Sequence, residues 1–164
     1  MKLKKISLPI IIVLGLILDQ LVKHAITQYI KLSGQKTVIK HVLSLTNLRN
    51  DGAAWSMLEG QQWFFLVITI VAVCVAIWFL MKNLSKNWYA FGLTLIISGA
   101  LGNFIDRMRQ GYVVDMFQID FVNFPIFNVA DVLLTIGFVL LFIGILTDKD
   151  DIENNKKDVN EGHA

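Results

Sequence analysis

Four long apolar stretches divide the chain, and polar residues gather between them. These stretches cover residues 6–30, 63–81, 88–105 and 126–146. A helix needs about 20 residues to cross the roughly 30 Å hydrocarbon core of a bilayer, so each stretch is long enough to do so. The pattern therefore predicts an all-α integral membrane protein with four transmembrane helices.

The loop at residues 31–62 is not uniformly polar. Residues 37–48 are rich in Val, Ile, Leu and Thr, and a turn signal follows at Asn50, Asp51 and Gly52. We expect a small extracytoplasmic β element here, between the first and second spans. The loop at 111–124 is also apolar, and we expect it to dip into the membrane interface.

The two ends of the chain differ in character. The segment 148–164 is charged and rich in asparagine, which predicts a disordered cytoplasmic tail after a single membrane-embedded domain at 1–147. The first residues resemble a secretory signal peptide, but no small-x-small cleavage pattern follows Leu18, and the polar Asp19 continues the helix instead. We therefore expect an uncleaved membrane anchor.

Basic residues suggest how the chain is oriented. Placing both termini in the cytoplasm puts many lysines on the inner side, as the positive-inside rule favours: Lys2, Lys4, Lys5, Lys82, Lys86, Lys149, Lys156 and Lys157. The loops at 31–62 and 106–125 then face outwards. The polar site is then expected towards the outer face of the membrane.

The composition argues against nucleic-acid binding, an intramolecular disulfide and a zinc site. With 55% apolar residues and a net charge of +2, the chain lacks the basic stripe of a nucleic-acid-binding protein. The single Cys74 excludes an intramolecular disulfide and offers no zinc spacing.

Three ionisable residues inside the predicted spans require an explanation. Asp19, Lys23 and Asp131 would each cost about 2.5–3.5 kcal/mol at mid-bilayer on the insertion scale if unpaired. Asp19 and Lys23 are four residues apart, acid first, which is the favourable order for an ion pair within one helix. Such charges must be paired, shallow, neutralised or functional.

Polar residues also converge at one predicted depth. Asn103, Asp106 and Arg107 share a face at the outer end of the third span, where Asp106 and Arg107 alone would suggest an interfacial ion pair. Asn128 and Asp131 share a face at the outer start of the fourth. Asp115 lies in the loop between these spans, so its carboxylate is expected at the same depth.

A close pair of carboxylates suits amide hydrolysis. Two such groups share one proton, so the ionised member can take a proton from water while the protonated member hydrogen-bonds the carbonyl oxygen. No metal is needed, and the histidines His24, His41 and His163 are scattered without metal-ligand spacing.

Several blocks in order resemble the bacterial lipoprotein signal peptidases, also called type II signal peptidases, over about residues 10–146. The blocks are Asp19, Gln20 and Lys23; Arg49, Asn50, Gly52, Ala53 and Ala54; Gly99, Ala100, Leu101, Gly102, Asn103, Ile105, Asp106 and Arg107; Val113, Val114 and Asp115; and Phe127, Asn128, Ala130 and Asp131.

The resemblance implies an aspartic endopeptidase that cuts diacylglyceryl-modified prolipoproteins just before the lipidated cysteine. It implies catalysis by Asp115 and Asp131, with no metal or cofactor, and it implies prolipoprotein signal peptides and membrane lipid as partners. It also implies a bacterial cell membrane as the location; nucleic acid is not an expected partner, because the chain lacks a basic stripe. The remaining positions are expected to order the site or contact substrate: Asp19, Lys23, Asn50, Gly52, Asn103, Asp106, Arg107, Asn128 and Ala130.

Three other functions are compatible with the residues alone. Intramembrane Asp and Lys also mark ion- or proton-coupled transport proteins, although no inverted repeat is visible. A peptidase could instead use Ser56 or Ser98 with Lys23 as base. A non-catalytic membrane partner could use the polar faces to bind another helix.

Overall fold

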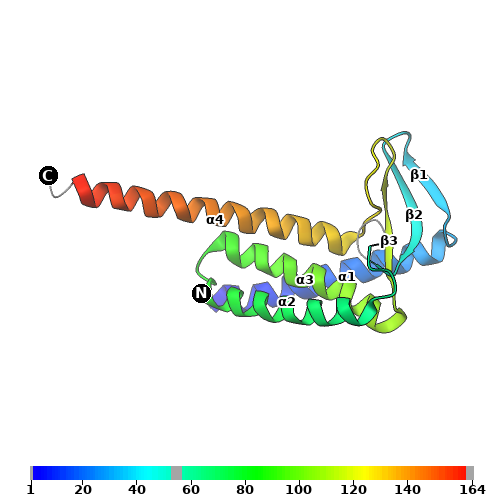
Figure 1. Cartoon of the computed structure of the whole chain (residues 1–164), viewed down its shortest axis with the longest axis horizontal. Coiled ribbons are helices and arrows are strands. Elements are labelled where there is room, and N and C mark those ends of the chain that lie inside the picture. Colours follow the sequence, from blue (N-terminus) through cyan, green and yellow to red (C-terminus); the bar gives the residue numbers. More distant parts are fainter. Residues whose placement is uncertain (1, 53–56, 162–164) are drawn as a thin grey trace.

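Four long helices lie side by side, and a small antiparallel sheet covers one end of them (Figure 1). The computed structural model describes residues 2–52 and 57–161. The start of α1 and the end of α4 lie at the end of the helices opposite the sheet. The elements are, in order, α1 (Lys2–Tyr29), β1 (Gln35–Ile39), β2 (Leu43–Asn50), α2 (Gln62–Lys82), α3 (Asn87–Gln110), β3 (Val113–Ile119) and α4 (Val129–Glu161).

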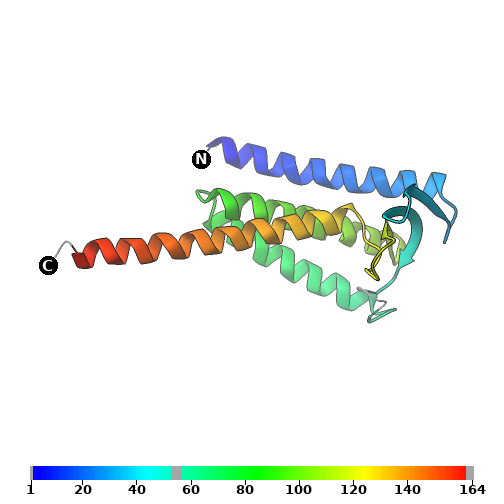
Figure 2. The same ribbon diagram turned by 90° about the horizontal axis from the view of Figure 1, so that it is seen from above.

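All four helices contain a stretch that is long and apolar enough to cross a bilayer, which confirms the predicted fold class. In α3, 56% of this stretch is buried, against 17% in each of the other helices, so α3 is the central helix. It lies between α1 and α2 when the molecule is seen from above (Figure 2).

Small residues let α3 and α4 approach closely. A Cβ atom built on Gly92 would lie 2.8 Å from the carbonyl oxygen of Gly137, and one built on Gly99 would collide with the carbonyl oxygen of Ala130. This close approach brings the half of α3 nearer the sheet directly against the start of α4.

Two helix ends differ from the sequence-based boundaries. α3 continues beyond residue 105 to Gln110, and Gly111 ends it in the left-handed conformation that glycine adopts easily. α4 begins at Val129 rather than at residue 126, because the backbone of Phe127 is hydrogen-bonded to Phe117. Pro125 therefore lies before the helix and outside its first turn.

The end of α4 also differs from the prediction. The helix continues to Glu161, where the sequence suggested disorder from residue 148 onwards. No glycine or proline interrupts residues 148–161, so no backbone signal ends the helix there. The apolar stretch within it ends at Asp148, which forms an ion pair with Lys86 at the end of the bundle opposite the sheet.

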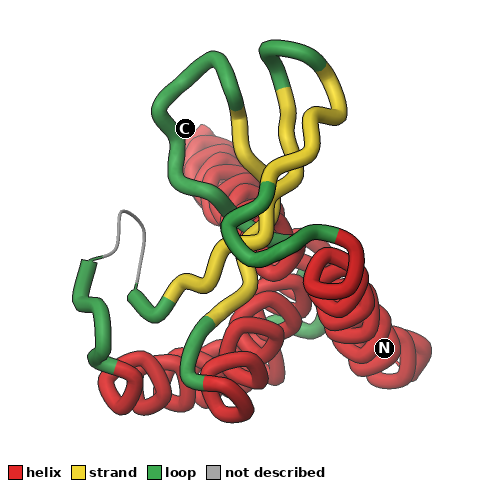
Figure 3. Tube along the Cα trace, turned by 90° about the vertical axis from the view of Figure 1, so that its right-hand side faces the viewer, coloured by secondary structure: helices red, strands yellow, loops and turns green. Residues whose placement is uncertain are grey.

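The expected β element is present, and the later segment 113–119 adds a strand to it. β1 and β2 form an antiparallel hairpin, and β3 pairs with β2 on its other side (Figure 3). β3 belongs to the loop at 111–124, which we expected to dip into the interface; its residues 113–119 join the sheet instead. Five of its seven residues are apolar, and the consecutive residues Val113 to Met116 are all buried, so this part of the strand is covered on both faces.

The sheet is fastened to the end of α1. The bulge between Leu45 and Leu48 turns Asn47 inwards, where its side-chain amide donates to the carbonyl oxygen of Ile30 at 2.8 Å. Val114 and Met116 pack against α1 in a buried apolar cluster. Since neighbouring strand residues point to opposite faces, Asp115 points away from that cluster.

Candidate active site

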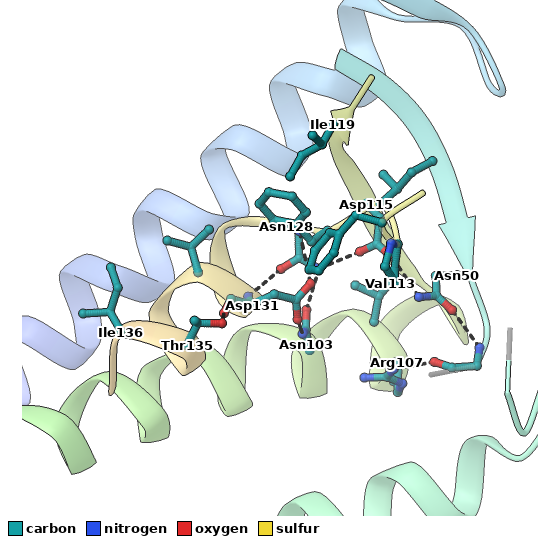
Figure 4. A pocket seen from close by; sticks show the side chains of 16 residues that line it. Asn50, Asn103, Arg107, Val113, Asp115, Ile119, Asn128, Asp131, Thr135 and Ile136 are labelled. Carbon is teal, nitrogen blue, oxygen red and sulfur yellow. Dashed lines mark hydrogen bonds between the residues drawn. The ribbon is translucent and has the colours of Figure 1, made fainter. Parts of the chain in front are cut away.

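Asp115 and Asp131 line the same groove (Figure 4). Asp115 comes from the middle of β3, and Asp131 from the first turn of α4. The groove has a volume of about 660 Å³, and apolar side chains of the β3–α4 connection and of α4 form much of its wall. Asp115 is only 2% exposed, so its carboxylate is held mainly by protein groups.

Asp131 and Asn128 cap the start of α4 reciprocally. The Asp131 backbone N–H donates to Asn128 Oδ1 at 3.0 Å, and the Asn128 backbone N–H donates to Asp131 Oδ2 at 3.1 Å. This is the geometry of a capping box, which satisfies two backbone donors at a helix start. The carboxylate is therefore fixed by the same contacts that begin the helix.

Side-chain amides from three elements surround the two carboxylates. Asn128 Nδ2 donates to Asp115 Oδ1 at 2.6 Å, and Asn50 Nδ2 donates to Asp115 Oδ2 at 2.8 Å. Asn103 Nδ2 donates to Asp131 Oδ1 at 2.8 Å. Asn128 contacts both acids, so it links them directly.

Other contacts fix the orientation of each amide. The Asn50 oxygen accepts from the Gly52 backbone N–H at 3.0 Å, so its nitrogen faces Asp115. The Asn103 oxygen accepts from Lys23 Nζ at 3.0 Å, so its nitrogen faces Asp131. An ammonium group can only donate, so it selects this orientation of the Asn103 amide.

Lys23 is the centre of a buried ionic network behind the groove. Its Nζ lies 2.9 Å from Asp19 Oδ2 and 2.8 Å from Asp106 Oδ2. The predicted pair of Asp19 and Lys23 is thus confirmed. Asp106 pairs with Lys23 and not with its neighbour Arg107, because the two side chains leave α3 in different directions.

This network also holds the elements that carry the two acids. Asp19 Oδ1 accepts from the Ala130 backbone N–H at 2.9 Å, so a residue of α1 caps a free donor at the start of α4. Asp106 Oδ2 accepts from the Val114 backbone N–H at 3.4 Å, next to Asp115. Gln20 Nε2 donates to Asp106 Oδ1 at 2.9 Å and completes the set.

Arg107 lines the groove on the other side. Its Nη2 donates to the carbonyl oxygen of Gly52 at 2.9 Å, and its guanidinium lies 4.7 Å from the ring centre of Phe65. Its buried Nε has no hydrogen-bond partner in the described structure, so one donor at the edge of the groove remains available.

Burial changes the protonation of Asp115. The pKa of this carboxyl is raised to about 6, mainly because the group is removed from water and also because the charge of Asp131 is near; hydrogen bonds from Asn50 and Asn128 limit the rise. A carboxyl that keeps its proton up to about pH 6, beside a second carboxylate, has the properties required of a proton-sharing pair.

The structure brings together every expected site residue that it describes. Gln20 also belongs to this network. It stands in the motif with Asp19 and Lys23, but no role in the site was predicted for it. Ala53, Ala54 and Ser56 lie outside the described residues. Ser98 is buried, and its hydroxyl donates to the carbonyl oxygen of Ile12 at 3.0 Å, away from Lys23. Within the described residues, no group of three His, Cys, Asp or Glu side chains is placed to hold a metal ion.

Curated relatives match nearly the whole chain. A lipoprotein signal peptidase of Lactococcus lactis is 60% identical over 148 residues, which cover 90% of this chain and 99% of the relative. A lipoprotein signal peptidase of Streptococcus agalactiae is 53% identical over 154 residues, covering 93% of this chain and all of the relative.

Solved structures and a family model agree with these relatives. A bacterial membrane enzyme determined at 2.3 Å resolution has a TM-score of 0.84 and 38% identity, covering 88% of this chain and 90% of that one. The model of the signal peptidase (SPase) II family matches residues 11–147. The chain therefore belongs to the signal peptidase II family, a family of membrane peptidases.

Proposed function

We propose that this protein is an aspartic endopeptidase that removes the signal peptide from diacylglyceryl-modified prolipoproteins, cutting just before the lipid-modified cysteine. The observation that carries the proposal is the placement of Asp115 and Asp131 on one groove, joined through Asn128. Membership of the family and the names of the relatives support the choice of substrate.

The proposed reaction uses one water molecule and one shared proton. The ionised carboxylate takes a proton from water as the water oxygen bonds to the scissile carbonyl carbon, and the protonated carboxyl hydrogen-bonds the carbonyl oxygen. The C–N bond of the tetrahedral intermediate then breaks, and a carboxyl proton passes to the leaving nitrogen. The products are a signal peptide with a new carboxylate and a lipoprotein with a free amino group on its cysteine.

The apolar wall of the groove suits a lipidated substrate. Val132, Thr135 and Ile136 continue along α4 from Asp131 into the membrane span, so acyl chains or signal-peptide side chains can lie beside the acids. Each buried methylene contributes about 0.8 kcal/mol. We expect the lipid to fix the depth of the scissile bond, which makes plain precursors poor substrates.

The proposed orientation places the acids at the outer face. Lys2, Lys4 and Lys5 at the start of α1 and Lys82 and Lys86 between α2 and α3 mark the end of the helices opposite the sheet. With that end in the cytoplasm, the sheet and both acids face outwards.

A reconstituted cleavage assay tests this function. The protein is combined with a lipidated precursor and with the same precursor lacking the lipid, in the presence of a chelator, and the products are identified by mass spectrometry. We expect one cut before the lipidated cysteine, normal rates for Ser56→Ala and Ser98→Ala, and little cleavage of the plain precursor. Equal cleavage of both precursors, or inhibition by the chelator, would contradict the proposal.

A further inference from the structure

A second cavity lies between the outer ends of α1 and α3 and shares no residue with the groove. Its volume is about 130 Å³, well above the roughly 10–15 Å³ that one water molecule requires. Nearly all of its lining side chains are polar: Gln20, Lys23, His24, Thr27, Asp106, Arg109 and Gln110, with Val114 as the exception. We call it the back cavity.

The depth of the back cavity limits what can fill it. His24 and Thr27 lie in the last two turns of α1, and Arg109 and Gln110 in the last turn of α3, so the cavity lies where the membrane spans end. Polar groups at this level need polar partners, and lipid headgroups and water provide them. Acyl chains do not.

The charges of the back cavity favour an anion. Asp106 is already compensated, because its carboxylate accepts from Gln20 and pairs with Lys23. Arg109 is exposed and makes no ion pair or hydrogen bond within the described part of the chain. A guanidinium group presents a fork of N–H donors that matches phosphate oxygens, and the imidazole of His24 adds a further donor. The hydroxyl of Thr27 donates to the backbone carbonyl oxygen of His24 at 2.8 Å, so it is not a free donor.

We propose that the back cavity binds the phosphate group of a phospholipid headgroup, with Arg109 as its main ligand and His24 as an additional donor. The anionic lipid then lies against the outer ends of α1 and α3, on the other side of Lys23 and Asp106 from the groove. This binding does not depend on the proposed peptidase activity.

Lipid retention tests the proposal. The protein is purified in a detergent without phosphate, titrated with phosphatidylglycerol, and examined by native mass spectrometry; diacylglycerol with the same acyl chains serves as the phosphate-free probe. Arg109→Gln is compared with Lys36→Gln, which removes the same charge from an exposed position on β1 that does not line the cavity.

We expect one phosphatidylglycerol per chain in wild type and Lys36→Gln, with no matching retention of diacylglycerol. Arg109→Gln should need about tenfold more phosphatidylglycerol or more, as for loss of a charge-assisted hydrogen bond, and Arg109→Lys should lie between. Equal retention in wild type and Arg109→Gln, or of both lipids, overturns the proposal. Displacement by millimolar inorganic phosphate would assign the cavity to free phosphate and overturn the lipid assignment.

Discussion

At the scale of single residues, asparagines hold the two acids in place. Asn128 alone donates a side-chain N–H to Asp115 and a backbone N–H to Asp131. The spacing of Asn128 and Asp131 before an apolar run is a capping-box signature that the sequence contains. The contact between Lys23 and Asn103 joins residues 80 positions apart, so no local pattern could predict it.

Removing the amide of Asn50 should change the pH dependence of cleavage. This amide stabilises the ionised form of Asp115, so Asn50→Ala should raise the pKa of Asp115 further above its value of about 6. We expect a bell-shaped pH profile whose alkaline limb moves to higher pH in the variant, with a lower maximum rate. The control is Asn123→Ala, at an exposed position in the β3–α4 loop, and an unmoved alkaline limb in Asn50→Ala would contradict this role.

Asp115 should also make folding stability depend on pH. Its folded pKa of about 6 exceeds the ordinary value of 3.8, so the folded state holds a proton that the unfolded state has lost between these values. Stability due to Asp115 is therefore fully present below about pH 4 and falls as pH rises to about 6, by an amount on the order of 3 kcal/mol.

Thermal unfolding in detergent, measured from pH 4 to 7, checks this linkage. In Asp115→Asn, the stability of the variant relative to wild type should improve as pH rises from about 4 to about 6 and stay level above that. A difference between the two proteins that does not vary with pH would show that Asp115 is not protonated in the folded protein.

At the scale of elements, the sequence predicts helices and strands that local residue patterns determine. It misses those that form only by pairing with a segment far away in the sequence. The four spans follow from apolar runs, and the β element follows from the run of Val, Ile, Leu and Thr at residues 37–48. The hairpin turn at residues 40–42 was not predicted. β3 was missed because Val113–Ile119 becomes a strand only by pairing with β2, more than 60 residues earlier, as in the pair of Leu48 and Asp115. The start of α4 shifted for the same reason, since Phe127 is paired with Phe117.

The close packing of α3 on α4 should matter for activity. In Gly99→Ala the new methyl group would collide with the carbonyl oxygen of Ala130 and push the start of α4 from α3, separating Asp131 from Asn103. Such overpacking costs about 1–3 kcal/mol. We expect a lower melting temperature and a large loss of kcat.

Gly144→Ala is the matched control for this prediction. Its methyl group would meet Trp88 and Tyr89 at 3.0 Å, in the same helix pair but at the inner end. It should lower stability while leaving kcat near the wild-type value. Equal loss of kcat in the two variants would show that the contact at Gly99 has no special effect on the site.

At the scale of the whole molecule, the charges of the chain ends and loops predict its orientation. Thiol labelling of intact cells tests it, with Cys74 replaced by serine and one new cysteine in each variant. Val122→Cys, exposed in the β3–α4 loop, should react with a membrane-impermeant reagent in intact cells. Ser85→Cys, between α2 and α3, should react only after lysis, and the reverse pattern would invert the orientation.

The central claim is that Asp115 and Asp131 act as one catalytic unit. Its most direct test is the single-turnover cleavage rate of a lipidated precursor by Asp115→Asn, Asp131→Asn and the double variant, all shown to be folded. Each single variant should lose roughly 10²–10⁴-fold or more, and the double variant should be no slower than the slower single variant, since removing either member of a unit removes its function. A single variant that cleaves at nearly the wild-type rate, or losses that multiply in the double variant, would contradict the account.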